Sequence, residues 1–247
     1  MIHYHGTPMT PVLDFAKAFA AKHAMVSFEH PAQIEMAAEI CQSVVLDNGA
    51  FSAWKQQKQY DFAGFLEWAK KWVRHPAVDW VIIPDVIDGD EQSNDALISS
   101  WPLSESISVP VWHLHESLER LERLCSAFPR IALGSSGVFA TVGDNKWWKR
   151  IAEAMRVLCD SDGMPKVKIH GLRMLDPGVF SKLPFSSADS CNVARNVGID
   201  SKWNGSYAPT SRYARAIVLM ERIERHASAS RWNEEVIPSY QNFELFG

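Results

Sequence analysis

Residues 109–137 read VPVWHLHESLERLERLCSAFPRIALGSSG and contain one complete unit of the predicted fold. The apolar run 110–114 is followed by 117–127, where apolar residues recur three and four positions apart, and then by a second apolar run, 131–133. Short apolar runs are typical of buried strands, and the longer spacing is typical of an amphipathic helix. This succession favours two parallel strands joined by a helix.

The same alternation continues along the chain. Short apolar runs fall at 2–4, 25–28, 44–46, 80–83, 110–114, 131–133, 167–169 and 185–188. Helix-length amphipathic segments lie between them, among others at 11–22, 61–74, 117–127 and 147–159. Eight strands that alternate with helices in 247 residues predict an α/β fold of the (β/α)8 TIM-barrel type. We expect residues 1–247 to form a single domain.

A doubly wound open sheet would show the same alternation of strands and helices. In that fold, a glycine-rich loop with three glycines at fixed spacing follows the first strand of a dinucleotide-binding site. Here the first run is followed by HGTPMTP at 5–11, which has one glycine and two prolines. The sequence therefore favours the barrel.

The composition is that of a globular domain, with 47% hydrophobic and 22% charged residues. No uncharged apolar run reaches 18 residues, and the N-terminus lacks the charged and apolar regions of a signal peptide. We therefore expect a cytoplasmic protein without a membrane partner. The four cysteines are far apart and form no CxxC pair, which argues against a disulfide framework and against a cysteine-rich zinc site.

The charge is distributed unevenly. The net charge of −4 predicts no general attraction to nucleic acid. Residues 193–231, however, hold seven Lys and Arg against three acids, so this segment carries +4 and the rest of the chain −8. One face of the protein could therefore be basic.

Polar residues follow nearly every predicted strand. Active sites of barrels lie at the carboxyl ends of the strands, so these residues are read as one set. They are His3, Tyr4, His5 and Gly6; Asp47, Asn48 and Gly49; Pro84 and Asp85; His113 and His115; Gly134, Ser135 and Ser136; His170, Gly171 and Arg173; and Asp189 and Ser190. A single Asp after a strand is more often a turn residue or a helix cap. Three Asp and three His that converge on one opening favour a catalytic site.

Paired carboxylates in one cavity can divide a reaction between them. One acts as an ionised nucleophile and the other as a proton donor when their surroundings separate their pKa values. This arrangement suits attack at an anomeric carbon, with a covalent sugar intermediate. Water as the incoming group gives hydrolysis, and a second base gives base exchange.

Five motifs carry a resemblance to a known family. VVLDNGAF (44–51), VIIPDVID (81–88), IALGSSG (131–137), KIHGLRM (168–174) and FSSADSCNVARNVG (185–198) resemble, in order and position, motifs of the tRNA-guanine transglycosylase superfamily. The similarity covers residues 44–198. It implies that Asp189 is the nucleophile attacking C1′ of a guanosine-type nucleotide and that Asp47 is the general acid and base.

The resemblance also implies which residues bind the base. Asp85 would accept hydrogen bonds from N1 and the exocyclic amine, and the backbone at Gly134 and Ser135 would contact the purine carbonyl oxygen. His170 would cover one face of the base. The remaining implied substrate-binding residues are His113, at a place where the family often has Gln, and Asn48 and Gly49 beside Asp47.

The chain also departs from the family pattern. tRNA-modifying members carry a cysteine-rich zinc module after the barrel, and the proline-threonine pair of the family is replaced here by CNVAR at 191–195. These differences resemble the compact, DNA-acting branch found in phages and bacterial modification clusters. That branch exchanges guanine in DNA for a 7-deazaguanine such as 7-cyano-7-deazaguanine.

The implied partners are DNA, with tRNA as the alternative substrate, and a free 7-deazaguanine base. A second copy of the chain or a helper protein is a further expected partner. Neither a metal nor another cofactor is implied. If a phage encodes the protein, its location would be the host cytoplasm.

Candidate nucleic-acid contacts lie in two segments. The basic segment provides Arg195, Lys202, Arg212 and Arg215, and the sequence 202–213, before a helix predicted to be capped near Thr210, could hold a phosphate. KWWKR at 146–150 provides Lys149 and two tryptophans. These indoles either stack on bases or pack the helix against the barrel.

Two rival functions remain open from the sequence. A metal-dependent hydrolase of the amidohydrolase type would use His3, His5, His113 or His115, and Asp189 as ligands. Against it, no histidine follows the sixth strand and no lysine follows the fourth. The second rival is a non-catalytic DNA-binding or partner subunit, although the chain keeps both Asp47 and Asp189.

Overall fold

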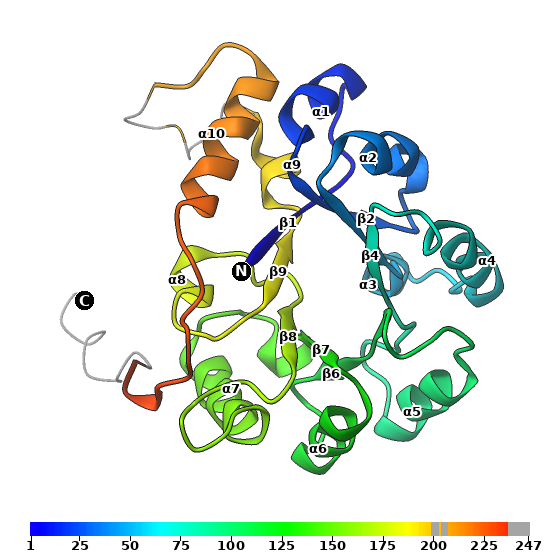
Figure 1. Cartoon of the computed structure of the whole chain (residues 1–247), viewed down its shortest axis with the longest axis vertical. Coiled ribbons are helices and arrows are strands. Elements are labelled where there is room, and N and C mark those ends of the chain that lie inside the picture. The colour runs from blue at the N-terminus through cyan, green and yellow to red at the C-terminus, as the bar shows by residue number, and fades with distance from the viewer. Residues whose placement is uncertain (199–202, 204–206, 237–247) are drawn as a thin grey trace.

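A single parallel sheet forms the centre of the protein in the computed structural model, which describes residues 1–198, 203 and 207–236 (Figure 1). Within these residues the strands follow the order β5-β4-β3-β2-β1-β9-β8-β7-β6. Their bounds are β1 Ile2–Gly6, β2 His23–Ser27, β3 Ser43–Asp47, β4 Val78–Ile82, β5 Ser108–Val109, β6 Val111–His113, β7 Arg130–Gly134, β8 Lys168–Gly171 and β9 Ser187–Ser190. The predicted α/β class and its parallel sheet are confirmed.

The two ends of this strand order meet at one residue. β5 pairs with β4 and β6 pairs with β7, and only Pro110 separates β5 from β6. Proline has no backbone N–H, so it interrupts the ladder at this point. Its carbonyl oxygen still accepts a hydrogen bond from the Ala132 amide at 3.0 Å. The sheet is therefore nearly closed and resembles a TIM barrel.

Most of the helices surround the ring of strands (Figure 1). The helices are α1 Val12–Phe19, α2 Ile34–Ile40, α3 Ala50–Lys55, α4 Phe62–Trp72, α5 Glu91–Ser100, α6 Leu118–Ala127, α7 Asn145–Leu158, α8 Pro177–Phe180, α9 Asn192–Asn196 and α10 Arg212–Glu224. By contrast with the others, α3 and α9 contribute residues to the opening at the strand ends. Side chains of Asp61, Ser117 and Asp144 accept hydrogen bonds from first-turn amides and so fix where α4, α6 and α7 begin. α10 is capped by Ser211, one residue after the predicted cap at Thr210.

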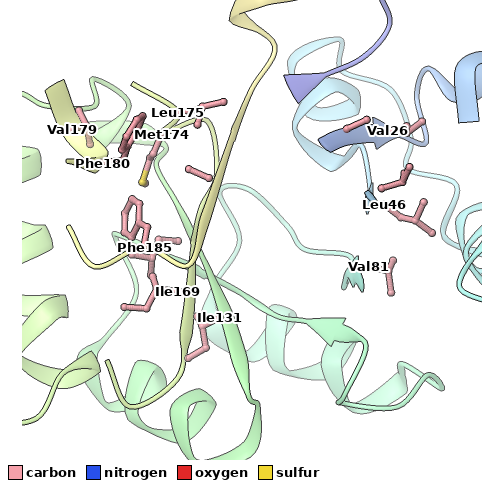
Figure 2. Packing of buried hydrophobic residues seen from close by; sticks show 14 of the residues in the cluster. Val26, Leu46, Val81, Ile131, Ile169, Met174, Leu175, Val179, Phe180 and Phe185 are labelled. Atoms are coloured by element: carbon pink, nitrogen blue, oxygen red, sulfur yellow. The ribbon is translucent and has the colours of Figure 1, made fainter. Parts of the chain in front are cut away.

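Apolar side chains pack on both faces of the sheet. On β3, Val44 and Leu46 point outward into the core beneath the helices, whereas Val45 points into the barrel with Tyr4 and Trp80. Figure 2 shows part of the outer core, with Val26, Leu46 and Val81 on one side and Ile131, Ile169 and Phe185 on the other.

Trp147 and Trp148 of α7 are both buried in the outer core. The packing interpretation of this tryptophan pair is therefore confirmed, and neither indole is available to stack on a nucleic-acid base.

Among the described residues, every helix is too short or too polar to cross a lipid bilayer.

A buried ion pair braces the carboxyl ends of β4 and β6. Arg120 of α6 is fully buried and donates to Glu116 Oε2 at 2.6 Å and to the Val111 carbonyl oxygen at 3.0 Å. The same Glu116 oxygen accepts a hydrogen bond from the His113 amide at 2.8 Å. The ion pair therefore fixes the chain where β6 ends.

The network continues to the segment after β4. Glu116 Oε1 accepts from Asn94 Nδ2 at 2.9 Å, and Asn94 Oδ1 accepts from the Val86 amide at 2.7 Å. Val86 follows Asp85 directly. Buried polar networks whose members are hydrogen-bonded rigidify the groups that they join. This network therefore holds Asp85 and His113 in a fixed relation.

We predict that Arg120→Ala lowers the free energy of unfolding by about 3–5 kcal/mol, because it leaves Glu116 buried and without its cation. Arg123→Ala is the matched control, since Arg123 is exposed and binds the same Asp95 that Arg120 contacts. It should cost less than about 1 kcal/mol. Urea unfolding measures both values, and similar losses for the two variants would contradict the prediction.

Candidate active site

A cavity of about 440 Å³ opens at the carboxyl ends of the strands. The sequence predicted a site at this end of the barrel, and the structure brings most of the predicted residues together there. Those that line the cavity are Asp47, Asn48, Asp85, His113, Gly134, Ser135, Asp189 and Arg195. Gly49, His170, Lys149, Arg212 and Arg215 do not line it. Lys202 lies outside the described residues.

Asp47, the last residue of β3, is positioned as a proton carrier. Burial, together with the nearby negative charges of Asp189 and Asp85, raises the pKa of its carboxyl group to about 7. The Ser27 hydroxyl and the Gly49 amide beside the carboxyl group lower the pKa and partly oppose this rise. A group with a pKa near 7 exists in both forms at neutral pH, as a general acid and base requires.

Gly49 shapes the turn after Asp47. Its φ of +78° lies in the left-handed region, which disfavours other residues. A Cβ atom here would lie 2.9 Å from Glu29 Cγ and 3.1 Å from the Glu29 backbone nitrogen. Gly49 thus allows the turn after Asp47 to pack closely against Glu29.

Asp85 is held by two side chains from neighbouring strand ends. Asn48 Nδ2 donates to Asp85 Oδ1 at 2.7 Å, and His113 Nε2 lies 2.8 Å from Asp85 Oδ2. Since an ionised carboxylate only accepts, Nε2 of His113 carries the proton of this bond. The three side chains form one polar unit on the cavity wall.

Gly134 makes room for His113. A Cβ atom on Gly134 would lie 2.8 Å from His113 Nδ1, which is buried and has no hydrogen-bond partner among the described residues. The neighbouring Ser135 accepts a hydrogen bond through its hydroxyl oxygen from Trp147 Nε1 at 2.8 Å. The buried indole thereby orients the loop that follows β7.

Asp189 of β9 faces Asp47 across the same cavity and is mostly buried. Its Oδ1 atom accepts a hydrogen bond from the Arg173 amide at 2.9 Å. Arg173 has a φ of +60°, an uncommon conformation for a residue with a side chain, which presents its amide to Asp189. The two predicted catalytic carboxylates therefore occupy one site.

His170 lies beneath Asp189. It is fully buried, its Nε2 atom is 3.3 Å from Asp189 Oδ1, and the edge of its ring packs on Trp80 with centroids 4.8 Å apart. The predicted role of covering one face of a base requires a place on the cavity wall. This placement differs from the prediction because His170 points into the barrel interior from β8.

The predicted nucleic-acid contacts divide into exposed and buried side chains. Arg195 and Arg212 are exposed, and Arg195 lines the cavity. Lys149 is exposed on α7. Arg215 differs from the other predicted contacts, because this side chain is 6% exposed and its guanidinium donates to the carbonyl oxygens of Val197, Pro209 and Thr210. It joins the chain after α9 to α10.

The histidines of β1 face away from the cavity. His5 Nε2 lies 2.9 Å from Glu224 Oε1 of α10, and His3 Nε2 lies 3.0 Å from the His226 carbonyl oxygen. Within the described ranges, no three His, Cys, Asp or Glu side chains are arranged to hold a metal ion. The amidohydrolase alternative needed His3 and His5 at the opening, where the structure does not place them.

Phe51 and Cys191 are among the cavity residues that the sequence did not single out, and Arg173 was placed only in the set of strand-end residues. The Arg173 guanidinium lies over the Phe51 ring, 4.1 Å from its centroid. Cys191 also lines the cavity, and burial raises the pKa of its thiol to about 11. Phe51 falls inside the VVLDNGAF motif, which is the signal that could have identified it.

No protein-family model matches the chain. A search of curated proteins likewise finds no significant match. The resemblance to the transglycosylase superfamily therefore stays a prediction, and the argument for function rests on the cavity.

The raised pKa of Asp47 predicts a pH-dependent cost to stability. Above pH 7 the folded protein holds a buried carboxylate that the unfolded chain exposes, whereas below about pH 4 both states are protonated. Asp47→Asn should therefore raise the free energy of unfolding by up to about 4 kcal/mol at pH 8. At pH 5 this gain in the free energy of unfolding should be less than half of its value at pH 8.

Urea unfolding of the parent and the Asp47→Asn variant at both pH values measures this difference. Asp88→Asn is the control, since Asp88 is exposed and does not line the cavity. A gain that is equal at pH 5 and pH 8 would show that the pKa of Asp47 is not raised.

Proposed function

We propose that this protein is a guanine transglycosylase that exchanges guanine in DNA for a 7-deazaguanine base such as 7-cyano-7-deazaguanine. The observation that carries the proposal is the pairing of Asp47 and Asp189 in one cavity, with the pKa of Asp47 raised to about 7. We further propose that β5 and β6 are one strand interrupted at Pro110. The whole chain is then one (β/α)8 domain.

In the first half-reaction a carboxylate oxygen of Asp189 forms a bond to C1′ of the target nucleotide. The bond between C1′ and the guanine nitrogen breaks, and its electron pair leaves with the base. Protonated Asp47 donates its proton to the departing guanine. The products are free guanine and an ester between Asp189 and the deoxyribose.

In the second half-reaction the Asp47 carboxylate removes a proton from the ring nitrogen of the incoming 7-deazaguanine. That nitrogen attacks C1′, and the bond between C1′ and Asp189 breaks with its electron pair returning to the carboxylate. Asp47 is then protonated and Asp189 is ionised, as at the start. A pKa near 7 allows Asp47 to serve in both directions.

The unit formed by Asp85, Asn48 and His113 suits recognition of the base edge. Each Asp85 oxygen already accepts one hydrogen bond, and each has a second lone pair available. These lone pairs can accept from N1–H and the exocyclic amine of guanine. Since 7-deazaguanine bases share this edge, the same unit can hold the leaving and the incoming base.

The size and surroundings of the cavity support a nucleotide that has left its helix. A cavity of about 440 Å³ falls within the range of small-molecule sites. Cleaving a glycosidic bond within DNA requires the nucleotide to rotate out of the stack, at a cost of a few kcal/mol. Arg195 at the cavity and Arg212 at the start of α10 are exposed cations that can contact phosphates.

The proposal predicts release of guanine from DNA when a free 7-deazaguanine is supplied. The parent protein should release labelled guanine from DNA in the presence of 7-cyano-7-deazaguanine, and tRNA should serve as the comparison substrate. Asp189→Asn should reduce release to background and abolish covalent trapping of DNA. Asp47→Asn should slow both half-reactions by roughly 10²–10⁴-fold.

Asp88→Asn is the matched control and should act like the parent. Guanine release by Asp189→Asn at the parental rate would remove Asp189 from the mechanism. Exchange on tRNA but not on DNA would keep the reaction and change the substrate. Activity on neither nucleic acid would refute the proposed function.

The exposed arginines predict how DNA binding depends on salt. Replacing Arg195 and Arg212 by Ala should weaken binding and reduce the slope of log K against log salt by about 2, because each phosphate contact contributes about 0.9. Arg225→Ala is the control. Arg225 is exposed just after α10, and its neighbour His226 contacts His3 near the start of β1. This end of the barrel lies away from the cavity at the carboxyl ends of the strands. Fluorescence anisotropy at several salt concentrations measures the slopes. An unchanged slope in the double variant would place the DNA path elsewhere.

A further inference from the structure

A chain of polar side chains leads through the barrel interior to Asp189, beginning at the half-buried Arg130 and continuing through the fully buried Ser187 and His170. Arg130 Nη1 donates to Ser187 Oγ at 3.3 Å, and Ser187 Oγ lies 2.9 Å from His170 Nδ1. On the other side of the ring, His170 Nε2 lies 3.3 Å from Asp189 Oδ1. None of Arg130, Ser187 and His170 lines the cavity.

Chemistry fixes the direction of these hydrogen bonds. Arginine can only donate, so Ser187 Oγ accepts from Arg130. The fully buried Ser187 hydroxyl contacts no other acceptor than His170 Nδ1 among the described residues, and leaving a buried donor unpaired costs about 1–3 kcal/mol. Ser187 therefore donates to Nδ1. His170 Nδ1 is then the acceptor nitrogen.

It follows that Nε2 of His170 carries the ring proton. Burial lowers the pKa of His170, which keeps the ring neutral with a single N–H group. Nε2 has no aligned hydrogen bond within the described part of the chain, and Asp189 Oδ1 lies 3.3 Å from it. A small rotation of the Asp189 carboxylate satisfies this buried donor.

We propose that His170 is a positioning residue of the exchange reaction. Ser187 and Arg130 orient its ring so that the Nε2–H group holds Asp189 Oδ1. The other oxygen, Oδ2, is then directed at C1′. This inference rests on the proposed role of Asp189 as the nucleophile.

The contacts of Asp189 distinguish its two oxygen atoms. Oδ1 faces two donors, the Arg173 amide at 2.9 Å and His170 Nε2 at 3.3 Å. Oδ2 makes no hydrogen bond to any described residue. When Oδ2 forms the ester bond to C1′, Oδ1 becomes its carbonyl oxygen and still accepts from both donors. The same contacts therefore hold the carboxylate before and after the covalent step.

The ring of His170 has little freedom to move. Trp80 and Tyr4 pack edge-to-face against it, with centroids 4.8 Å and 6.2 Å away. Of the charged groups around it, Asp189 raises the pKa of the ring and Arg130 lowers it. His170 is thus held by packing as well as by Ser187.

Two variants of similar size separate donation from packing. His170→Gln keeps a neutral N–H donor near the position of Nε2, whereas His170→Met fills the space without a donor. At saturating DNA, His170→Met should form the covalent intermediate about 10²-fold more slowly than the parent, because misplacing a reacting group by about 1 Å costs this much. His170→Gln should recover to within about tenfold of the parent.

The half-saturating DNA concentration should change less than about threefold in either variant, since His170 does not line the cavity. Single-turnover trapping measures the rates, and thermal unfolding checks the fold of each variant. A His170→Met rate within threefold of the parent would overturn the proposal.

A second measurement does not need activity. Nitrogen-15 NMR of histidine-labelled protein should find Nε2 of His170 protonated at pH 7, and Ser187→Ala should lose this preference. A parent spectrum with Nδ1 protonated would overturn the proposal, whether or not the protein exchanges bases. Absence of exchange on DNA and tRNA would instead refute the proposed function, and the tautomer would still decide how His170 faces Asp189.

Discussion

The nearly closed parallel sheet, whose two edges approach each other at Pro110, sets the positions of the groups at its opening. β5 and β6 are too short to form a long ladder, yet each satisfies one edge of the sheet, by pairing with β4 and with β7. Because all the described strands are parallel, their carboxyl ends lie at the same end of this nearly closed ring. Asp47 from β3 and Asp189 from β9 meet there although 142 positions apart in the sequence.

The acids at this opening differ in how their charge is supported. Asp85 is held by Asn48 and His113, and Asp189 by the Arg173 amide. Asp47 lies close to the negative charge of Asp189 and is buried, and both effects raise its pKa. Since the three residue types are identical, these surroundings alone distinguish the carboxylates, as the proposed division between a nucleophile and a proton carrier requires.

Polar groups behind the cavity determine its geometry. Glu116 and Arg120 fix the chain after β4 and β6, while Ser187 and Arg130 orient His170 below Asp189. Each group is hydrogen-bonded to a partner from another part of the chain, and all except the half-buried Arg130 are buried. Such networks are costly when incomplete, so they favour one arrangement of the residues that line the cavity.

The order of apolar runs and amphipathic segments was enough to predict a parallel, barrel-like sheet and the end of it at which the candidate site lies. Apolar periodicity records which faces are buried, and the residue after each strand is fixed by its position in the chain. Only the tertiary structure decided that His3 and His5 point toward α10, that Arg215 binds backbone carbonyls, and that His170 lies beneath Asp189. The physical reason is that a strand alternates its side chains between two faces. The pattern of alternation does not say which face is which, or whether a histidine or arginine will meet a carboxylate or a carbonyl. Those partners come from segments distant in the sequence that the fold brings into contact.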